Sequence, residues 1–207
     1  MIQERAYFKE IEGKRIFCVR TRPAKKSRGC VILVHGFRSS ADGSARRFII
    51  LSRRLAQIGI ASVRFDQYGS GHSEGDFYNS SFSDWVRTII YFINHYTEKN
   101  HKLGLVGVSM GATALVKAME NKKIRDRIAG LALLVPDPKI DRMMIRGEFM
   151  EEGGQRVNKK FWAETEECNF LSNLASFTRK CLIFYGEKDK HVPPKTLNQL
   201  LSEIKKQ

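Results

Sequence analysis

The chain of 207 residues lacks the marks of several large classes of protein. Its four cysteines are widely scattered, and no two of them have the close spacing of a zinc or redox motif. No apolar run approaches the roughly 20 residues that a membrane-spanning helix needs. The first residues include Glu4 and no apolar segment, so they do not resemble a secretory signal. We therefore expect a cytoplasmic protein without a membrane span.

A stripe of residues for binding nucleic acid is also missing, although the chain is strongly basic. Lys and Arg number 36 against 22 Asp and Glu, which gives a net charge of +14. Such a charge can attract nucleic acid, anionic membranes or acidic substrates. The basic residues are dispersed, however, and aromatic residues do not alternate with them as they do where bases stack. We predict a basic surface and no nucleic-acid partner.

The composition is that of a globular protein with a substantial core. Hydrophobic residues make up 42% of the chain and charged residues 28%, and there are no repeats or linker-like stretches. Short apolar runs alternate with helical patterns, which is typical of a mostly parallel sheet with helices on both faces. The sequence therefore predicts a single α/β domain over residues 1–207.

Hydrophobic periodicity and turn residues locate the expected elements. One helix should bury Phe48, Leu51, Leu55 and Ile58 on one face and end at Gly59. Strands are expected at about residues 6–10, 15–20, 30–34, 60–65, 103–108, 128–135 and 181–185, and further helices at 84–96, 111–120 and 196–204.

Residues 139–180 differ in character from the rest of the chain. They are rich in aromatic residues and contain the turn Gly153-Gly154. The segment is too long for a simple loop and too short for a domain. We predict a small helical lid over a pocket, and the alternative is an insertion that packs on the core without touching a ligand.

The strongest chemical signal is the segment Gly107-Val108-Ser109-Met110-Gly111, which has the pattern G-x-S-x-G. It lies directly after a predicted buried strand and before a helix, where a sharp turn lifts the serine above the sheet. Glycines are needed because neighbouring backbone crowds both positions. The helix that follows directs its free N–H groups and positive dipole end at the reacting centre. This placement predicts a nucleophilic serine rather than a structural one.

The segment His35-Gly36-Phe37 directly follows another predicted strand. Together with the G-x-S-x-G segment, it makes the sequence resemble the α/β-hydrolase family from about residue 14 onward. By this resemblance, the backbone N–H groups of Phe37 and Met110 form an oxyanion hole, which is usually the largest single catalytic contribution. The resemblance also implies that His35 is a structural residue beside the hole and not the catalytic base.

A further segment, Asp66-Gln67-Tyr68-Gly69-Ser70-Gly71-His72-Ser73, resembles the family's loop D-x-R-G-x-G-x-S. Tyr68 stands where arginine is usual. The resemblance implies that this loop shapes the floor of the active site without taking part in the chemistry. His72 is then a loop residue and not a catalyst.

The segment Gly186-Glu187-Lys188-Asp189-Lys190-His191-Val192-Pro193 resembles the family's turn G-x-x-D-x-x-V-P after the seventh strand. By this resemblance, Asp189 is the acid that orients the catalytic imidazole and stabilises its charged form. Asp137, which follows the preceding predicted strand, is the alternative acid because some hydrolases place theirs there.

The resemblance implies a catalytic histidine well past the acid, after an eighth strand. Only residues 190–207 follow Asp189, and half of them are predicted to form one helix. His191 lies in the same turn as the acid, and His95 and His101 lie at the opposite end of the predicted sheet from Ser109. We therefore expect the chain to stop before its catalytic histidine and to have crippled activity.

The resemblance to carboxylesterases, feruloyl esterases and monoacylglycerol lipases implies a serine hydrolase that cleaves carboxylic esters through an acyl-enzyme on Ser109. The expected partner is a small-molecule ester or thioester, since a thioesterase or acyl-transferase would use the same residues. No cofactor or metal is implied. The alternative from another class is a non-catalytic binding protein that keeps the fold.

The strand expected at residues 181–185 contains neither a charged residue nor a proline. At the edge of a sheet, such a strand presents backbone donors and acceptors to another chain. We therefore expect a homodimer or aggregation through this edge.

Overall fold

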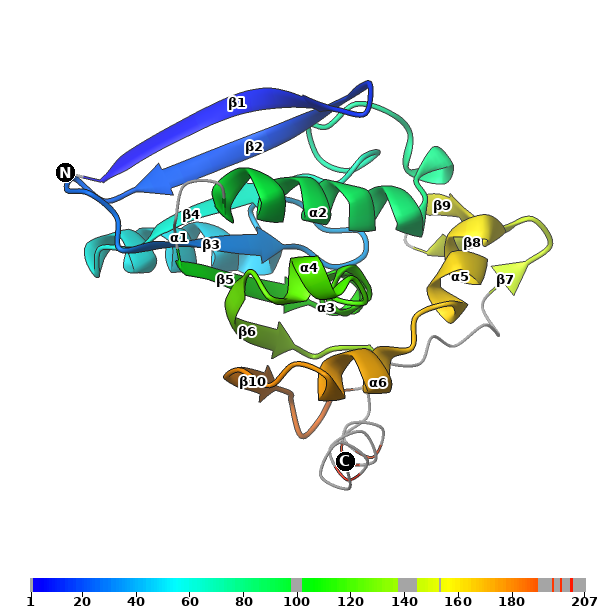
Figure 1. Ribbon diagram of the computed structural model, residues 1–207. Helices are drawn as coiled ribbons and strands as arrows, with labels where there is room; N and C mark the ends of the chain where they lie inside the picture. The colour runs from blue at the N-terminus through cyan, green and yellow to red at the C-terminus, as the bar shows by residue number, and fades with distance from the viewer. Residues whose placement is uncertain are drawn as a thin grey trace.

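The computed structural model describes residues 2–97, 102–137, 145–152 and 154–189, together with residues 195, 198 and 202. Seven strands form one sheet, in the spatial order β1 (Gln3–Ile11), β2 (Lys14–Arg22), β4 (Ala61–Phe65), β3 (Gly29–Val34), β5 (Lys102–Val108), β6 (Ile128–Leu134) and β10 (Cys181–Phe184) (Figure 1). β2 pairs antiparallel with β1 and β4, and the remaining pairs are parallel. The mostly parallel sheet predicted from the sequence is confirmed.

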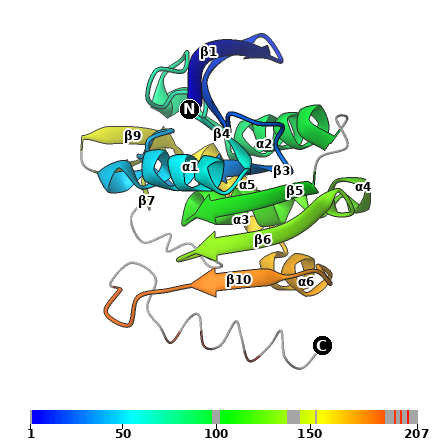
Figure 2. The ribbon, with the colours of Figure 1, turned by 90° about the vertical axis from the view of Figure 1, so that its left-hand side faces the viewer.

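Helices cover both faces of this sheet. Figure 2 shows α1 (Arg47–Gln57) on one side and α2 (Phe82–Thr97), α3 (Met110–Ala118) and α6 (Phe170–Ala175) on the other. The short helix α4 (Lys122–Arg125) follows α3, and the 3₁₀ turns η1 (Ser44–Arg46) and η2 (Phe77–Asn79) precede α1 and α2. The carboxyl ends of β3, β4, β5, β6 and β10 therefore all lie at one edge of the sheet, because these strands run in the same direction.

The core is most heavily aromatic between α2 and the sheet. Phe65 of β4 stacks on Phe92 of α2 with ring centroids 4.4 Å apart. Trp85 and Ile89 of the same helix face are fully buried. Apolar residues recur three and four positions apart in α2, so they form one continuous stripe against the strands. Each such large side chain contributes about 1.5–3 kcal/mol when it is fully buried.

The buried face of α1 differs from the prediction. Phe48 is buried, but Leu51 and Leu55 are only half-buried. Ile58 lies beyond the last helical residue and is 57% exposed. The helix instead packs on β4 with the face that includes Ser52, which is fully buried. The sequence pattern misled because part of the apolar face of α1 lines a pocket instead of the core.

The segment predicted as a helical lid is only partly helical, which differs from the prediction. Its described part starts with a three-stranded antiparallel sheet of β7 (Ile145–Arg146), β8 (Phe149–Glu152) and β9 (Gln155–Asn158). The helices α5 (Lys159–Glu166) and α6 follow. Gly147 and Gly154 have φ values of 66° and 76° and form the turns between these strands. Strands of two to four residues are too short for a readable alternation of apolar and polar residues.

Within the described residues, no helix is both long and apolar enough to cross a membrane. The helix predicted at 196–204 lies almost entirely outside the described residues.

Candidate active site

Ser109 occupies a sharp turn between β5 and α3. Its backbone has φ 49° and ψ −125°, a conformation that is strained for a residue with a side chain. The Ser109 N–H donates to the carbonyl of Leu134 at 2.9 Å. The Ser109 carbonyl accepts from the N–H groups of Ala112 and Thr113. These bonds hold the strained turn in place, and the serine itself is only half-buried.

The two glycines of the G-x-S-x-G segment are required by close packing. A Cβ atom on Gly111 would lie 2.2 Å from the carbonyl oxygen of His35, and one on Gly107 would lie 2.7 Å from the Cα of Ala112. Gly36 is similarly confined, because its Cβ would lie 2.9 Å from the Val108 carbonyl and 3.2 Å from the Cβ of Ser109. The turn after β3 therefore packs directly on the serine elbow.

His35 is held rigidly beside the elbow and is fully buried. Its Nε2 accepts the N–H of Gln67 at 2.9 Å, and its Nδ1 donates to the Gly36 carbonyl at 2.8 Å. Both ring nitrogens are thus engaged in the neutral form. Burial lowers the pKa of His35 below its ordinary value. The geometry agrees with a structural role and leaves no ring nitrogen for proton transfer at Ser109.

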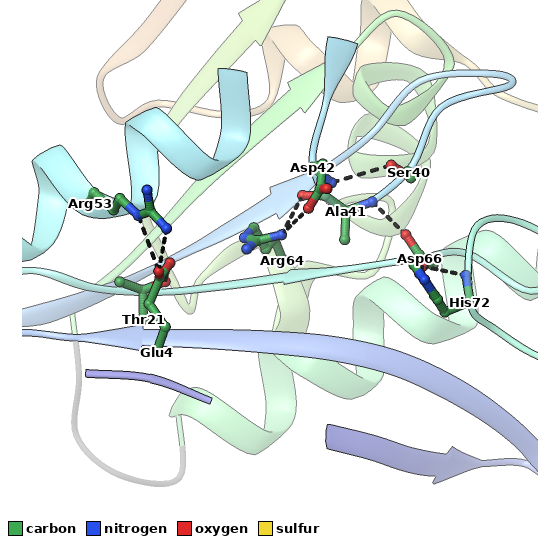
Figure 3. Close-up of polar contacts among 9 residues, drawn as sticks. All are labelled: Glu4, Thr21, Ser40, Ala41, Asp42, Arg53, Arg64, Asp66 and His72. Atoms are coloured by element: carbon green, nitrogen blue, oxygen red, sulfur yellow. Dashed lines mark hydrogen bonds and ion pairs between the residues drawn. The ribbon is translucent and has the colours of Figure 1, made fainter. Parts of the chain in front are cut away.

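Asp66 connects the two loops that flank the site, a role that the sequence analysis did not predict. One carboxylate oxygen accepts the N–H of Ala41, and the other accepts the N–H of His72 at 2.7 Å (Figure 3). Asp66 is fully buried at the carboxyl end of β4. The one signal in the sequence was its position directly after a buried strand. The imidazole of His72 is mostly exposed and packs on the ring of Phe17.

Tyr68, which replaces the arginine usual in this loop, packs within the loop. A Cβ on Gly75 would lie 2.2 Å from the Cζ of Tyr68, so the ring covers that glycine. The ammonium group of Lys14 lies 4.7 Å from the centre of the same ring, which is a cation–π distance. The departure from the family pattern therefore leaves the loop anchored to the start of β2.

A pocket of about 170 Å³ opens beside Ser109, mostly between the elbow and α1. Apolar side chains supply most of its wall, namely Phe37, Phe48, Leu51, Val108 and Leu134. Ser39, Ser44 and Arg47 lie on its more polar part. A small apolar group can therefore be buried next to the serine hydroxyl. A mostly apolar lining with a few polar groups is the composition usual for small-molecule sites.

Phe37 joins the pocket to the insertion. Its ring lies 4.9 Å from that of Phe77, 5.9 Å from that of Phe161 and 5.0 Å from that of Trp162. The last two residues belong to α5. Through these contacts, the insertion touches the turn that carries the predicted oxyanion donor.

The structure brings three of the predicted site residues together. Phe37 follows Gly36, which packs on Ser109, and Met110 is buried at the first position of α3. Asp189 lies in the turn after β10 at the same edge of the sheet, and its N–H donates to the Gly186 carbonyl at 3.2 Å. β6 separates β10 from β5.

Other residues weighed from the sequence lie elsewhere or outside the described part of the chain. Asp137, the alternative acid, uses its backbone carbonyl to accept the hydroxyl of Thr113 at 2.7 Å. His95 stacks on Tyr91 near the end of α2, far from the carboxyl edge. His101 and His191 lie outside the described residues. In the part of the chain that is described, no three His, Cys, Asp or Glu side chains are grouped to hold a metal ion.

A strained serine elbow at the carboxyl edge of a mostly parallel sheet, with a glycine turn packed against it, defines an α/β hydrolase. The chain belongs to the family described as serine aminopeptidase, S33, whose sequence model matches residues 25–167. No curated protein sequence matches the chain.

Solved structures share this fold. Est1E from Butyrivibrio proteoclasticus, solved with ferulic acid bound, matches with a TM-score of 0.85 at 19% identity, over 96% of this chain and 85% of that chain. A thioesterase domain from the curacin biosynthetic pathway matches at 0.71 and 15%, over 98% and 90%. A monoacylglycerol lipase from Paleococcus ferrophilus matches at 0.69 and 19%, over 91% and 84%. These likenesses confirm the predicted α/β-hydrolase fold, and the family is one of hydrolases.

Proposed function

We propose that the chain is a serine hydrolase that cleaves carboxylic esters through an acyl-enzyme on Ser109. The observation that carries this proposal is the strained Ser109 elbow, which faces a mostly apolar pocket of about 170 Å³. The similarity of the fold to an esterase and a lipase supports it. A strained backbone conformation costs free energy, and such conformations cluster at active and ligand-binding sites.

The proposed chemistry assigns one role to each part of the site. The Ser109 hydroxyl attacks the ester carbonyl, and the backbone N–H groups of Phe37 and Met110 donate to the oxyanion that develops. The positive end of α3 adds to this stabilisation. The base takes the proton of the Ser109 hydroxyl and passes it to the alkoxide, which leaves as the alcohol. Water then attacks the acyl-serine, which releases the carboxylic acid and restores the Ser109 hydroxyl. The apolar pocket holds the acyl group.

The proposed acid is Asp189, which orients an imidazole that acts as the base. Without such a base, a serine hydroxyl is a weak nucleophile at neutral pH. Of the histidines that the structure describes, His35 has both ring nitrogens engaged, His72 packs on Phe17 beside Asp66, and His95 lies far from the carboxyl edge. Residues 139–180 are the proposed lid, since Phe161 and Trp162 lie against Phe37.

The serine assignment is tested by labelling with a fluorophosphonate probe and by hydrolysis of p-nitrophenyl butyrate. We expect labelling and weak hydrolysis in the unsubstituted chain, because the described residues supply no base beside Ser109, and neither signal in Ser109→Ala. Ser172→Ala removes an exposed serine from α6 and is the matched control. Butyryl thioesters compared with the oxygen esters identify the preferred leaving group. Labelling that persists in Ser109→Ala, or is absent from the unsubstituted chain, would contradict the assignment.

We also propose that two copies of the chain pair through β10. Among the described strands β10 lies at the edge of the sheet, and Leu182 and Phe184 are 46% and 53% exposed. The carbonyls of Lys180 and Phe184 accept the N–H groups of Leu131 in β6 and of Val135 just after it, so the backbone groups of the odd-numbered residues of β10 point outward. An antiparallel pair centred on Ile183 sets Leu182 beside Phe184 of the second copy.

The same register also matches charges at the two ends of the pair. Arg179 and Glu187 are exposed and lie just outside the two ends of β10, so this register places Arg179 of one copy on the side of Glu187 of the second. The symmetry of a two-fold axis repeats this contact at the other end. The charge match and the apolar pair favour this register over its neighbours.

A further inference from the structure

A second hollow, of about 360 Å³, adjoins the pocket at Ser109. The two share Ser39, Gly43 and Ser44 as a common wall. The hollow is built from three segments that are far apart in the sequence: the turn after β3, the loop after β4, and β9 of the insertion. Unlike the pocket at Ser109, it is lined mainly by polar groups.

One lining group has an unsatisfied hydrogen-bonding capacity. Ser70 is 7% exposed, and its hydroxyl has no hydrogen-bond partner within the described residues. Its backbone is fixed, because its N–H donates to the Gln67 carbonyl and its own carbonyl accepts from Ser73. A buried hydroxyl without a partner is unfavourable, so a molecule in the hollow would gain by bonding to it.

The charges around the hollow favour a neutral ligand over an anion. The carboxylate of Asp66 lies directly beneath Gly71, where a Cβ would be 2.2 Å from its Oδ2. A second negative charge above this buried carboxylate would be repelled. Arg38, the cation among the lining residues, is exposed and already interacts with another group.

The remaining groups on the wall both donate and accept hydrogen bonds. They belong to the residues Ser39, Ser40, Ser44 and Gln155, whose side chains carry hydroxyl and amide groups. An anion only accepts, whereas a molecule with several hydroxyls can use both capacities. The volume corresponds to about twelve water molecules at roughly 30 Å³ each, which leaves room for a small organic molecule with several hydroxyl groups.

We propose that this hollow binds the alcohol part of the substrate and selects alcohols with several neutral hydroxyls, such as a sugar. The proposal rests on the function proposed for Ser109. The acyl group occupies the apolar pocket, the ester carbonyl lies at the serine, and the alcohol extends past Ser39 and Ser44 into the hollow. Ser70 and Gln155 are its specificity-determining residues, contributed by the loop after β4 and by the insertion.

Binding is tested with methyl β-glucoside, which contains no ester and so reports on the hollow independently of the chemistry at Ser109. Saturation-transfer NMR is expected to detect binding by the unsubstituted chain and equally by Ser109→Ala. Ser70→Ala and Gln155→Ala should each weaken it about threefold to tenfold, the effect of one neutral hydrogen bond. Ser172→Ala and Gln57→Ala, at exposed positions elsewhere, should leave it unchanged.

The outcomes separate the two proposals. Glucoside binding without any hydrolysis of p-nitrophenyl butyrate would overturn only the function proposed for Ser109. Three outcomes would contradict the hollow as a site for polyhydroxylated alcohols. The first is hydrolysis without glucoside binding, and the second is equal binding by Ser70→Ala, Gln155→Ala and their two control variants. The third is displacement of the glucoside by a lower concentration of inorganic phosphate. The side chain of Gln155 is exposed, so Gln155→Ala should not disturb folding. This variant keeps the test valid if Ser70→Ala lowers the melting temperature.

Discussion

The strained backbone conformation of Ser109 is maintained by individual residues that pack closely around it. Gly107 and Gly111 allow β5, α3 and the turn after β3 to approach within distances that exclude any Cβ. The hydrogen bonds of the Ser109 N–H and carbonyl then hold its φ at 49°. The elbow is thus a product of packing on all sides, and removing one glycine should release or distort it.

We expect Gly111→Ala to lower the free energy of unfolding by about 1–3 kcal/mol or more, the usual effect of overpacking. The added methyl group would lie 2.2 Å from the His35 carbonyl, and that backbone atom cannot move without shifting β3. Urea denaturation measures the loss. Gly130→Ala is the matched control, because its Cβ meets only the Lys180 carbonyl at an ordinary 3.7 Å. Equal effects of the two substitutions would contradict a role for close packing at Gly111.

His35 should make stability depend on pH in the mildly acidic range. Burial lowers its pKa in the folded state, while the unfolded chain takes up a proton as the pH falls through about 6.5. Below that pH the unfolded state binds more protons, so stability present above pH 6.5 is lost as the pH decreases. The slope from one such group is at most about 1.4 kcal/mol per pH unit.

This dependence is measured by urea denaturation of the chain between pH 7.5 and 5.5. His35→Gln should be less stable at pH 7.5 but should lose less stability on acidification. An unchanged slope in His35→Gln would show that another group is responsible.

Among the larger elements, β10 offers the clearest test. We expect the chain to dimerise at micromolar concentrations in sedimentation velocity, and Phe184→Lys to be monomeric because it places two like charges in the apolar centre. Arg179→Glu and Glu187→Arg should each weaken the dimer roughly twofold to thirtyfold, since each cross-strand pair contributes about 0.2–1 kcal/mol and occurs twice. Combining both substitutions should restore association.

A matched control lies on the opposite edge of the sheet. Phe8 of β1 is 48% exposed, and Phe8→Lys should leave the dimer intact. Dissociation by Phe8→Lys as complete as by Phe184→Lys, or failure of the double charge exchange to restore the dimer, would refute pairing through β10.

For the molecule as a whole, the sheet and the serine elbow were predictable from sequence because their signals are local. The apolar runs of β3, β5 and β6 match the sheet strands closely, since a buried parallel strand is apolar throughout. The sharp turn at Ser109 was predictable because a serine between two glycines, directly after such a run, is characteristic of a strand-to-helix elbow. Both signals lie within a few consecutive residues.

The tertiary structure alone decided the features that depend on contacts between distant segments. The three short strands of the insertion pair with one another and carry too few residues for a periodic signal. The buried face of α1 is set by the pocket beside Leu51, and the engagement of His35 is set by Gln67, 32 residues away. The polar hollow combines Ser39, Ser70 and Gln155, which are far apart in the sequence. Such sites arise where backbones are brought together by folding, and no stretch of the sequence contains them.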